Sequence, residues 1–140
     1  MGETEDRLRV LEDKDEIREL TARYCLAIAA GDVEKIVTLF CPDGAFVTSA
    51  GESVGSDELR RFYDRGGTTN KPFVQNHVIE VSGDEAVGRC AVEVRMVSDG
   101  EAYTAAGEYV DLLRRVDGRW RFASRDFRPY HRARLSDGWA

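Results

Sequence analysis

Three short turns containing aspartate and glycine divide the second half of the sequence into four long stretches of alternating apolar and polar residues. The turns lie at residues 82–84, 98–100 and 116–118, and the stretches cover residues 73–81, 86–97, 103–115 and 119–128. Alternation with a period of two is typical of strands, and aspartate–glycine turns are typical of hairpins. The pattern therefore predicts an antiparallel meander of unusually long strands, so the fold must be built around a large sheet.

The first half of the chain begins with a predicted amphipathic helix. Asp13 and Glu16 form a D-x-x-E capping box, which predicts that this helix begins at residue 13 and ends before Gly31. Apolar residues then recur at intervals of three and four and form one stripe: Ile17, Leu20, Tyr24, Ala27 and Ile28. The charged residues 1–12 are expected to form an N-terminal arm, either irregular or as a short helix.

Two shorter helices are predicted to follow. Asp32 is a good N-cap for the second helix, and the Pro42-Asp43-Gly44 segment is expected to stop it. Ser56 is a good N-cap for the third helix, which is expected to end at Gly66-Gly67. Helices followed by a meander indicate an α+β domain with its helices on one face of the sheet.

A further strand is predicted between the second and third helices. Residues 45–48 alternate, and residues 51–55 are expected to form a turn or a short return strand. The chain of 140 residues then fits one domain at residues 13–130, with a C-terminal tail at residues 131–140. Residues 51–55 also match G-x-S-x-G, but an antiparallel pattern in so short a chain excludes an α/β hydrolase.

The charge balance argues against two classes of partner. The formal net charge is −6 and the isoelectric point is about 5.0, so nucleic acid and anionic membranes are expected to be repelled. The cluster of Arg125, Arg128, Arg132 and Arg134 is the best case for nucleic acid, but it could equally pack on a neighbouring subunit. The sequence shows no signal peptide or membrane-spanning run, so a cytoplasmic location is expected.

The cysteine and histidine content gives little support for a metal or a disulfide. Cys25, Cys41 and Cys90 are irregularly spaced among apolar residues and are expected to be free, reduced and buried. His77 and His131 are the two histidines of the chain, and no metal-ligand spacing is present. Since no phosphate-binding glycine motif is present either, neither a metal nor a cofactor is expected.

The order and spacing of several fragments resemble the SnoaL-like branch of the NTF2-like superfamily, which includes scytalone dehydratase, polyketide cyclases and hexachlorocyclohexane dehydrochlorinase. The fragments lie at residues 17–24, 31–32, 39–40, 43–46, 55, 74–76, 81–86, 107–109 and 117–122. The resemblance implies a cone-shaped fold in which three N-terminal helices pack on a strongly curved, mostly antiparallel sheet. Such a cone could keep an apolar hollow for a small ligand.

The catalytic dyad of the family's dehydratase-like members is missing. The resemblance places their aspartate at Ala29 and their histidine at Pro72, and neither side chain can take a proton. What does match is Asn76, together with Arg125 at the position where some members have a pocket arginine. A pocket with hydrogen-bonding groups but without the usual base is therefore expected.

Strand alternation limits which side chains can face that pocket. If Pro72 points inward, Asn76 points inward and His77 outward, unless a bulge intervenes. Arg125 would need a bulge near residues 123–124, because Trp120 and Phe122 have the opposite parity. Arg125 could also serve an ion pair with Asp126, Asp111 or Glu108, and Asn76 could bond a helix end.

Tyr24 is the third candidate site residue, because it lies on the apolar stripe and points toward the sheet. Its hydroxyl could end in the core or in the cavity. As catalytic candidates, Asn76 and Arg125 would stabilise an oxyanion, and Tyr24 would act as a general acid.

Two functions remain open. The first is a cofactor-independent lyase, isomerase or cyclase of secondary or catabolic metabolism, acting on an apolar, oxygenated small molecule, as the resemblance implies. The second is a non-catalytic ligand-binding or dimerisation module that has lost the dyad. A homodimer through the outer sheet face is expected, because the outward positions include too much apolar surface for a monomer to expose. Among these positions are Phe73, His77, Ile79 and Val81.

Overall fold

The elements of the fold are described for residues 2–64 and 68–138 by a computed structural model. The helices are α1 (Glu3–Ala30), α2 (Val33–Thr38) and α3 (Ser56–Tyr63), followed near the C-terminus by a 3-10 turn, η1 (Leu135–Asp137). The strands are β1 (Phe40–Thr48), β2 (Gly51–Val54), β3 (Thr68–Ser82), β4 (Glu85–Ser98), β5 (Glu101–Val116) and β6 (Arg119–Arg134). None of the described helices is both long and apolar enough to cross a membrane.

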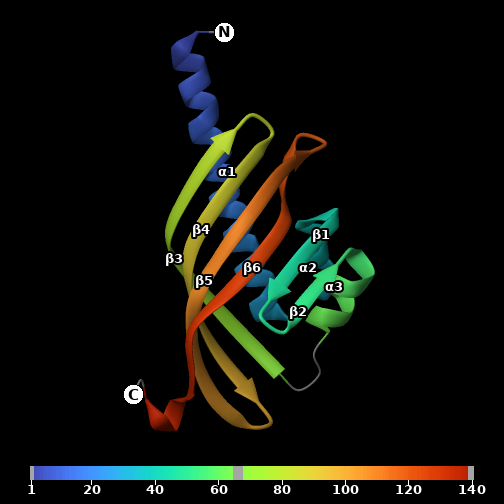
Figure 1. Ribbon diagram of the computed structural model, residues 1–140, viewed down its shortest axis with the longest axis vertical. Coiled ribbons are helices and arrows are strands. Elements are labelled where there is room, and N and C mark those ends of the chain that lie inside the picture. Colours follow the sequence, from blue (N-terminus) through green and yellow to red (C-terminus); the bar gives the residue numbers. More distant parts are fainter. Residues whose placement is uncertain (1, 65–67, 139–140) are drawn as a thin grey trace.

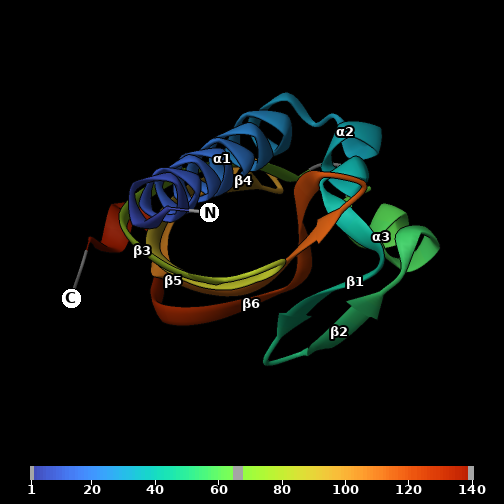
Figure 2. The same cartoon turned by 90° about the horizontal axis from the view of Figure 1, so that it is seen from above.

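The described strands form one sheet in the order β2-β1-β6-β5-β4-β3. All neighbouring strands are antiparallel except β1 and β6, which pair in parallel. The sheet curves strongly, and α1 runs across its concave side (Figures 1 and 2). This arrangement confirms the predicted α+β fold and the meander of β3 to β6.

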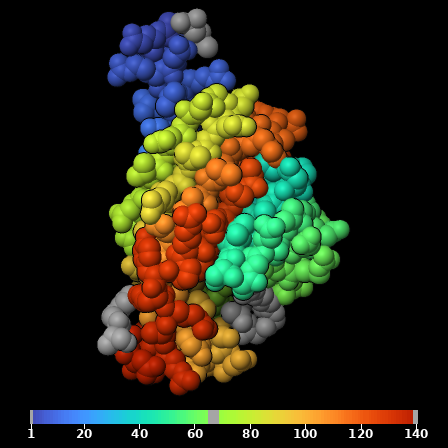
Figure 3. Space-filling model, viewed as in Figure 1, coloured from blue at the N-terminus to red at the C-terminus, as the bar shows by residue number. Residues whose placement is uncertain are grey.

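The first helix begins ten residues earlier than predicted. Helix α1 starts at Glu3, so most of the predicted arm is helical and continuous with the main helix. Its first turns project beyond the sheet (Figures 1 and 3). The capping prediction for Asp13 was wrong, because Asp13 lies inside the helix and its carboxylate is used by residues distant in sequence.

The other predicted helix ends have mixed outcomes. Asp32 does cap α2, since its Oδ1 accepts a hydrogen bond from Lys35 N at 3.1 Å. The N-cap of α3 is Gly55 rather than Ser56, and a glycine has no side chain with which to cap the helix. The Pro42-Asp43-Gly44 segment lies within β1 instead of stopping α2, which ends at Thr38. The predicted end of α3 at Gly66-Gly67 lies outside the described residues.

Of the bulges in the long strands, one in β3 and the first of two in β6 decide which of the candidate side chains face the helix. In β3, Gln75 pairs with Ala91 and Val78 with Arg89, so two β3 residues lie opposite Cys90. In β6, an extra residue at position 123 is accommodated by a shift in the β5–β6 pairing. Each bulge inserts one residue and reverses the inward and outward alternation beyond it.

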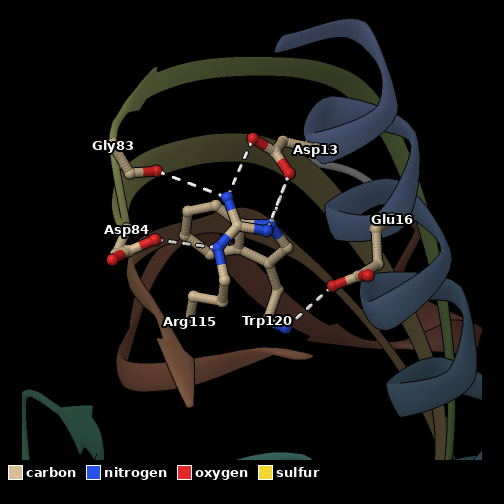
Figure 4. Close-up of polar contacts among 6 residues, drawn as sticks. All are labelled: Asp13, Glu16, Gly83, Asp84, Arg115 and Trp120. Carbon is tan, nitrogen blue, oxygen red and sulfur yellow. Dashed lines mark hydrogen bonds and ion pairs between the residues drawn. The ribbon is translucent and has the colours of Figure 1, made fainter. Parts of the chain in front are cut away.

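An arginine clamp holds α1 to the turn between β3 and β4 and to the joined ends of β5 and β6 (Figure 4). Arg115 donates to both carboxylate oxygens of Asp13, at 2.9 and 3.0 Å, and to Asp84 at 2.9 Å. The indole nitrogen of Trp120 also donates to Asp13, and the Trp120 backbone N–H donates to Glu16. Burial opposes ionisation of Asp13, but the bonds from Arg115 and Trp120 outweigh it and lower the pKa of this carboxyl.

The clamp should contribute much more to stability than a surface ion pair. We expect Arg115→Met to lower the free energy of unfolding by about 3 kcal/mol, because Asp13 would stay buried without its cation. Urea denaturation measures this loss. Arg114→Met is the matched control, since its pair with Asp43 at 2.6 Å is exposed and should contribute less than about 1 kcal/mol. Equal losses in the two variants would contradict the clamp.

The outer sheet face exposes apolar side chains, although not all of those predicted. Ile79 is 3% exposed and belongs to the core, and Val81 packs against that core. Both differ from the prediction because the β3 bulge reverses the alternation before them. Phe73 is exposed, as expected. Val87 and Leu112, which pair across β4 and β5, add further exposed apolar surface on this face, which Figure 3 presents.

We therefore expect a homodimer through this outer face. Light scattering at micromolar protein should give twice the chain mass of 15.7 kDa. The double variant Val87→Glu and Leu112→Glu should give a monomer with an unchanged circular dichroism spectrum, because both side chains are outside the core. A wild-type mass of one chain would remove the claim.

Candidate functional site

The β3 bulge places Asn76 and His77 opposite to their predicted orientations. Asn76 adopts a left-handed conformation with φ of +56°, which asparagine tolerates better than most residues, and its side chain is exposed. His77 is therefore turned toward the interior and is half-buried. The prediction of Asn76 as a pocket residue was wrong, and so was the outward orientation predicted for His77, because the bulge reverses the alternation between them and Pro72.

The β6 bulge has the position that the sequence required. Leu112 pairs with Ser124 and Leu113 with Phe122, which leaves Ala123 as the extra residue. As a result, both Phe122 and Arg125 have no exposed surface, and Trp120 is buried as well. The inward orientation of Arg125 is confirmed, although its catalytic role stays a prediction.

Arg125 is enclosed by a carboxylate and three aromatic rings. Its Nε and Nη2 donate to the two oxygens of Asp111 at 2.8 and 2.9 Å. The guanidinium carbon lies 3.9 to 4.5 Å from the ring centres of Tyr109, Phe122 and Tyr24. Burial opposes the charge, but attraction and hydrogen bonding from Asp111 outweigh it and raise the pKa of Arg125. The Nη1 atom finds no hydrogen-bond partner among the described residues.

Tyr24 lies in an aromatic cluster at the centre of the core. Its hydroxyl is 2.8 Å from that of Tyr63 on α3, and its ring makes edge contacts with Phe40, Tyr109 and Phe122. Burial, reinforced by Tyr63, raises the pKa of Tyr24 well above its ordinary value. The hydroxyl therefore stays protonated at neutral pH and can serve as a hydrogen-bond donor.

His77, Cys90 and Asp111 form a second polar group beside Arg125. One potential ligand atom from each lies within 4.8 Å of the other two. His77 Nε2 is buried and has no hydrogen-bond partner among the described residues. Burial is the main cause of a lowered pKa for His77 and of a pKa of about 11 for Cys90. At neutral pH the group thus contains a neutral imidazole, a thiol and a paired carboxylate.

Among the described residues, His77, Cys90 and Asp111 are the one group of side chains that is close enough together to hold a metal ion. Nitrogen, sulfur and carboxylate ligands would suit zinc. Two observations argue against a metal ion here. Both Asp111 oxygens already accept hydrogen bonds from Arg125, and the guanidinium so close to this carboxylate would repel a second cation bound to it. The arrangement is better suited to proton transfer and to stabilising negative charge.

The polar cluster of His77, Cys90, Asp111, Arg125 and Tyr24 is closed. Asp111, Arg125 and Tyr24 are at most 2% exposed, so almost no water-sized space touches them. The expected open hollow beside Arg125 and Tyr24 was therefore not found. Two described hollows, of about 590 and 480 Å³, are lined by other residues and open on the surface.

The positions of the missing dyad offer no substitute for it. Pro72 is buried in β3, and Ala29 is exposed near the end of α1. The structure brings Tyr24 and Arg125 together, excludes Asn76 and adds His77. One sequence signal could have indicated His77: asparagine, which favours left-handed backbone, directly precedes it in a long strand.

The comparison with protein families matches residues 9–126 to the model of the SnoaL-like domain. Among solved structures, a variant of Rv3472 from Mycobacterium tuberculosis, a protein of unknown function, is 32% identical with a TM-score of 0.80. That match covers 92% of this chain and 76% of the other. No protein with a curated description is significantly similar in sequence.

Two more distant structures share the fold. LinA is 18% identical with a TM-score of 0.85, over 93% of this chain and 94% of its own. A ketosteroid isomerase-like protein from Erwinia carotovora atroseptica is 22% identical with a TM-score of 0.73, over 84% of this chain and 95% of its own. The match to the SnoaL-like domain covers most of this chain and confirms the resemblance that the short fragments indicated. The chain therefore belongs to the SnoaL-like family.

Proposed function

We propose that the chain is a cofactor-independent enzyme that binds an apolar, oxygenated small molecule in the cone and catalyses a proton transfer of lyase, isomerase or cyclase type. The observation that carries the proposal is a pair of buried polar atoms without partners among the described residues, Arg125 Nη1 and His77 Nε2, which belong to two residues that both lie beside Asp111. Unpartnered buried polar atoms cost free energy, and they are often retained where a ligand completes them.

The three groups have complementary chemistry for a carbonyl substrate. A neutral His77 with its free nitrogen can take a proton from the carbon next to a carbonyl. The electron pair of that C–H bond moves toward the carbonyl oxygen, which becomes an enolate. Arg125 Nη1–H and the Tyr24 hydroxyl can donate to this oxygen, and return of the proton at another carbon completes an isomerisation.

In this proposal the ligand reaches Tyr24 through a movement of α3. The Tyr24 hydroxyl is bonded to that of Tyr63, which is half-buried and lies at the end of α3. A ligand oxygen can replace the Tyr63 hydroxyl as the partner of Tyr24, so that one hydrogen bond exchanges for another. The movement also separates the Tyr63 ring from Phe40 and Phe46, and ligand contacts have to offset that loss. Closure of α3 over the ligand would then exclude water from the reaction.

The alternative function is a non-catalytic ligand-binding or dimerisation module. Its support is the complete enclosure of Arg125, whose pair with Asp111 and three aromatic contacts resemble a structural ion pair. The two functions differ in one observable, because only an enzyme exchanges substrate protons.

Both functions can be tested with 2-naphthol, an aromatic oxyanion mimic, and with 2-cyclohexenone in deuterated water. We expect naphthol binding by fluorescence titration, weakened about tenfold in Tyr24→Phe, and enone deuteration detected by NMR and slowed at least about a hundredfold in His77→Gln. Tyr103→Phe is the control, because its hydroxyl bonds Glu101 at a distant place. Binding without deuteration would favour a ligand-binding module. No binding would remove the enzyme and the ligand-binding module, and would leave only the dimerisation module.

The pH dependence of stability should report the buried state of His77. Because burial lowers the pKa of His77, the unfolded chain takes up this proton first, near pH 6.5. The free energy of unfolding should therefore fall as the pH drops below about 6.5, and this part of the loss should be absent in His77→Gln. Urea titrations across this range, with NMR titration of the imidazole, check the expectation; a pKa above the ordinary value would contradict it.

A further inference from the structure

The hollow of about 590 Å³ lies on the helical side of the molecule, apart from the polar cluster. Its walls come from the middle of α1, the end of α2 and the turn between β5 and β6, which lie together on one side in Figure 2. This volume is within the range of small-molecule sites. The hollow is thus a second place where a ligand could bind, and none of its residues belongs to the proposed active site.

The acidic side chains of this hollow are already engaged. Glu16 accepts a hydrogen bond from the Trp120 backbone N–H at 2.8 Å, and Glu19 forms an ion pair with Arg23 at 3.4 Å. Both carboxylates are therefore partly satisfied before any ligand arrives. Neither forms an ion pair with Lys35, Arg119 or Arg121 among the described residues. The charged side chains that line the hollow, four basic and two acidic, leave it with a net charge of +2.

Three basic side chains remain around the hollow, namely Lys35, Arg119 and Arg121. None of them forms an ion pair with a residue in the described ranges, whereas Arg23, Arg114 and Arg115 do. Arg119 and Arg121 are two residues apart on β6 and share one of its faces. Three positive charges around one space repel each other, so a bound anion would lower their energy.

Between the charged walls the hollow has apolar surface. Leu20 and Trp120 are buried beneath it, and Leu39 packs against the core at its edge. A ligand with a carbon skeleton would therefore gain contact area in addition to charge interactions. The basic surface is also local, because the whole chain has a net charge of −6.

We propose that this hollow binds a small organic anion with at least two negative charges, of the phosphate-ester or polycarboxylate class. The two guanidinium groups would each donate paired hydrogen bonds to its oxygens, and Lys35 would add a third positive charge from α2. The site is separate from the proposed catalytic centre, so its occupation does not depend on the proposed function.

The test is calorimetric titration of the full chain with pyrophosphate and with citrate, at about 50 mM NaCl, where screening is modest. At least one anion should bind with a Kd below about 1 mM, and the triple variant Lys35→Gln, Arg119→Gln and Arg121→Gln should weaken it at least about tenfold. The anion that binds more tightly identifies the ligand class.

A matched triple variant separates a local site from general attraction. Arg7→Gln, Arg61→Gln and Lys71→Gln removes three exposed positive charges elsewhere and gives the same net charge as the first variant. We expect it to bind as the wild type does, and we expect NMR shifts on binding at the amides of Thr38 and Gly118. Equal weakening in both variants, shifts spread over the surface, or no binding of either anion would overturn the proposal.

Discussion

The ion pair between Asp111 and Arg125 sets the conditions that the rest of the core meets. The guanidinium of Arg125 has no exposed surface, so it has lost its hydration free energy. Contacts inside the protein must offset that loss. Asp111 satisfies two of its nitrogens, and the faces of Tyr24, Tyr109 and Phe122 provide favourable cation–π contacts. The aromatic centre of this cone and its charged pair are thus one unit, since neither would be stable in this form without the other.

The sheet could be predicted from the sequence because its signals are local, whereas the start of α1 could not. Turns and alternation define a meander without reference to other segments. The β6 bulge could also be foreseen, since Phe122 and Arg125 both needed inner positions that strict alternation forbids. The prediction that the helix begins at Asp13 was wrong, because a capping motif expresses only a local preference. Its carboxylate instead bonds Arg115, 102 residues further along the chain, and the helix continues past it.

The candidate site was harder to predict, because it depends on a bulge that the alternation did not require. The alternating pattern of β3 gives no indication of an extra residue, so strict alternation predicts that Asn76 faces inward and His77 outward. Once the bulge is present, His77 comes close to Cys90 on β4 and Asp111 on β5. Such a grouping depends on the register of three strands, and an error of one residue in any of them exchanges the inner and outer faces.

The coupling of Asp111 to Arg125 has a consequence for how the evolution of related sequences can be interpreted. Loss of either partner alone leaves a buried charge, so selection for folding preserves the two together even in lineages that perform no chemistry. Their joint retention is therefore no sign of catalysis. Folding does not require His77 in the same way, since its Nε2 has no partner among the described residues, and it does not require Asn76, the left-handed residue before it. Positions 76 and 77 are where descendants that kept the polar cluster and descendants that kept only the fold would diverge.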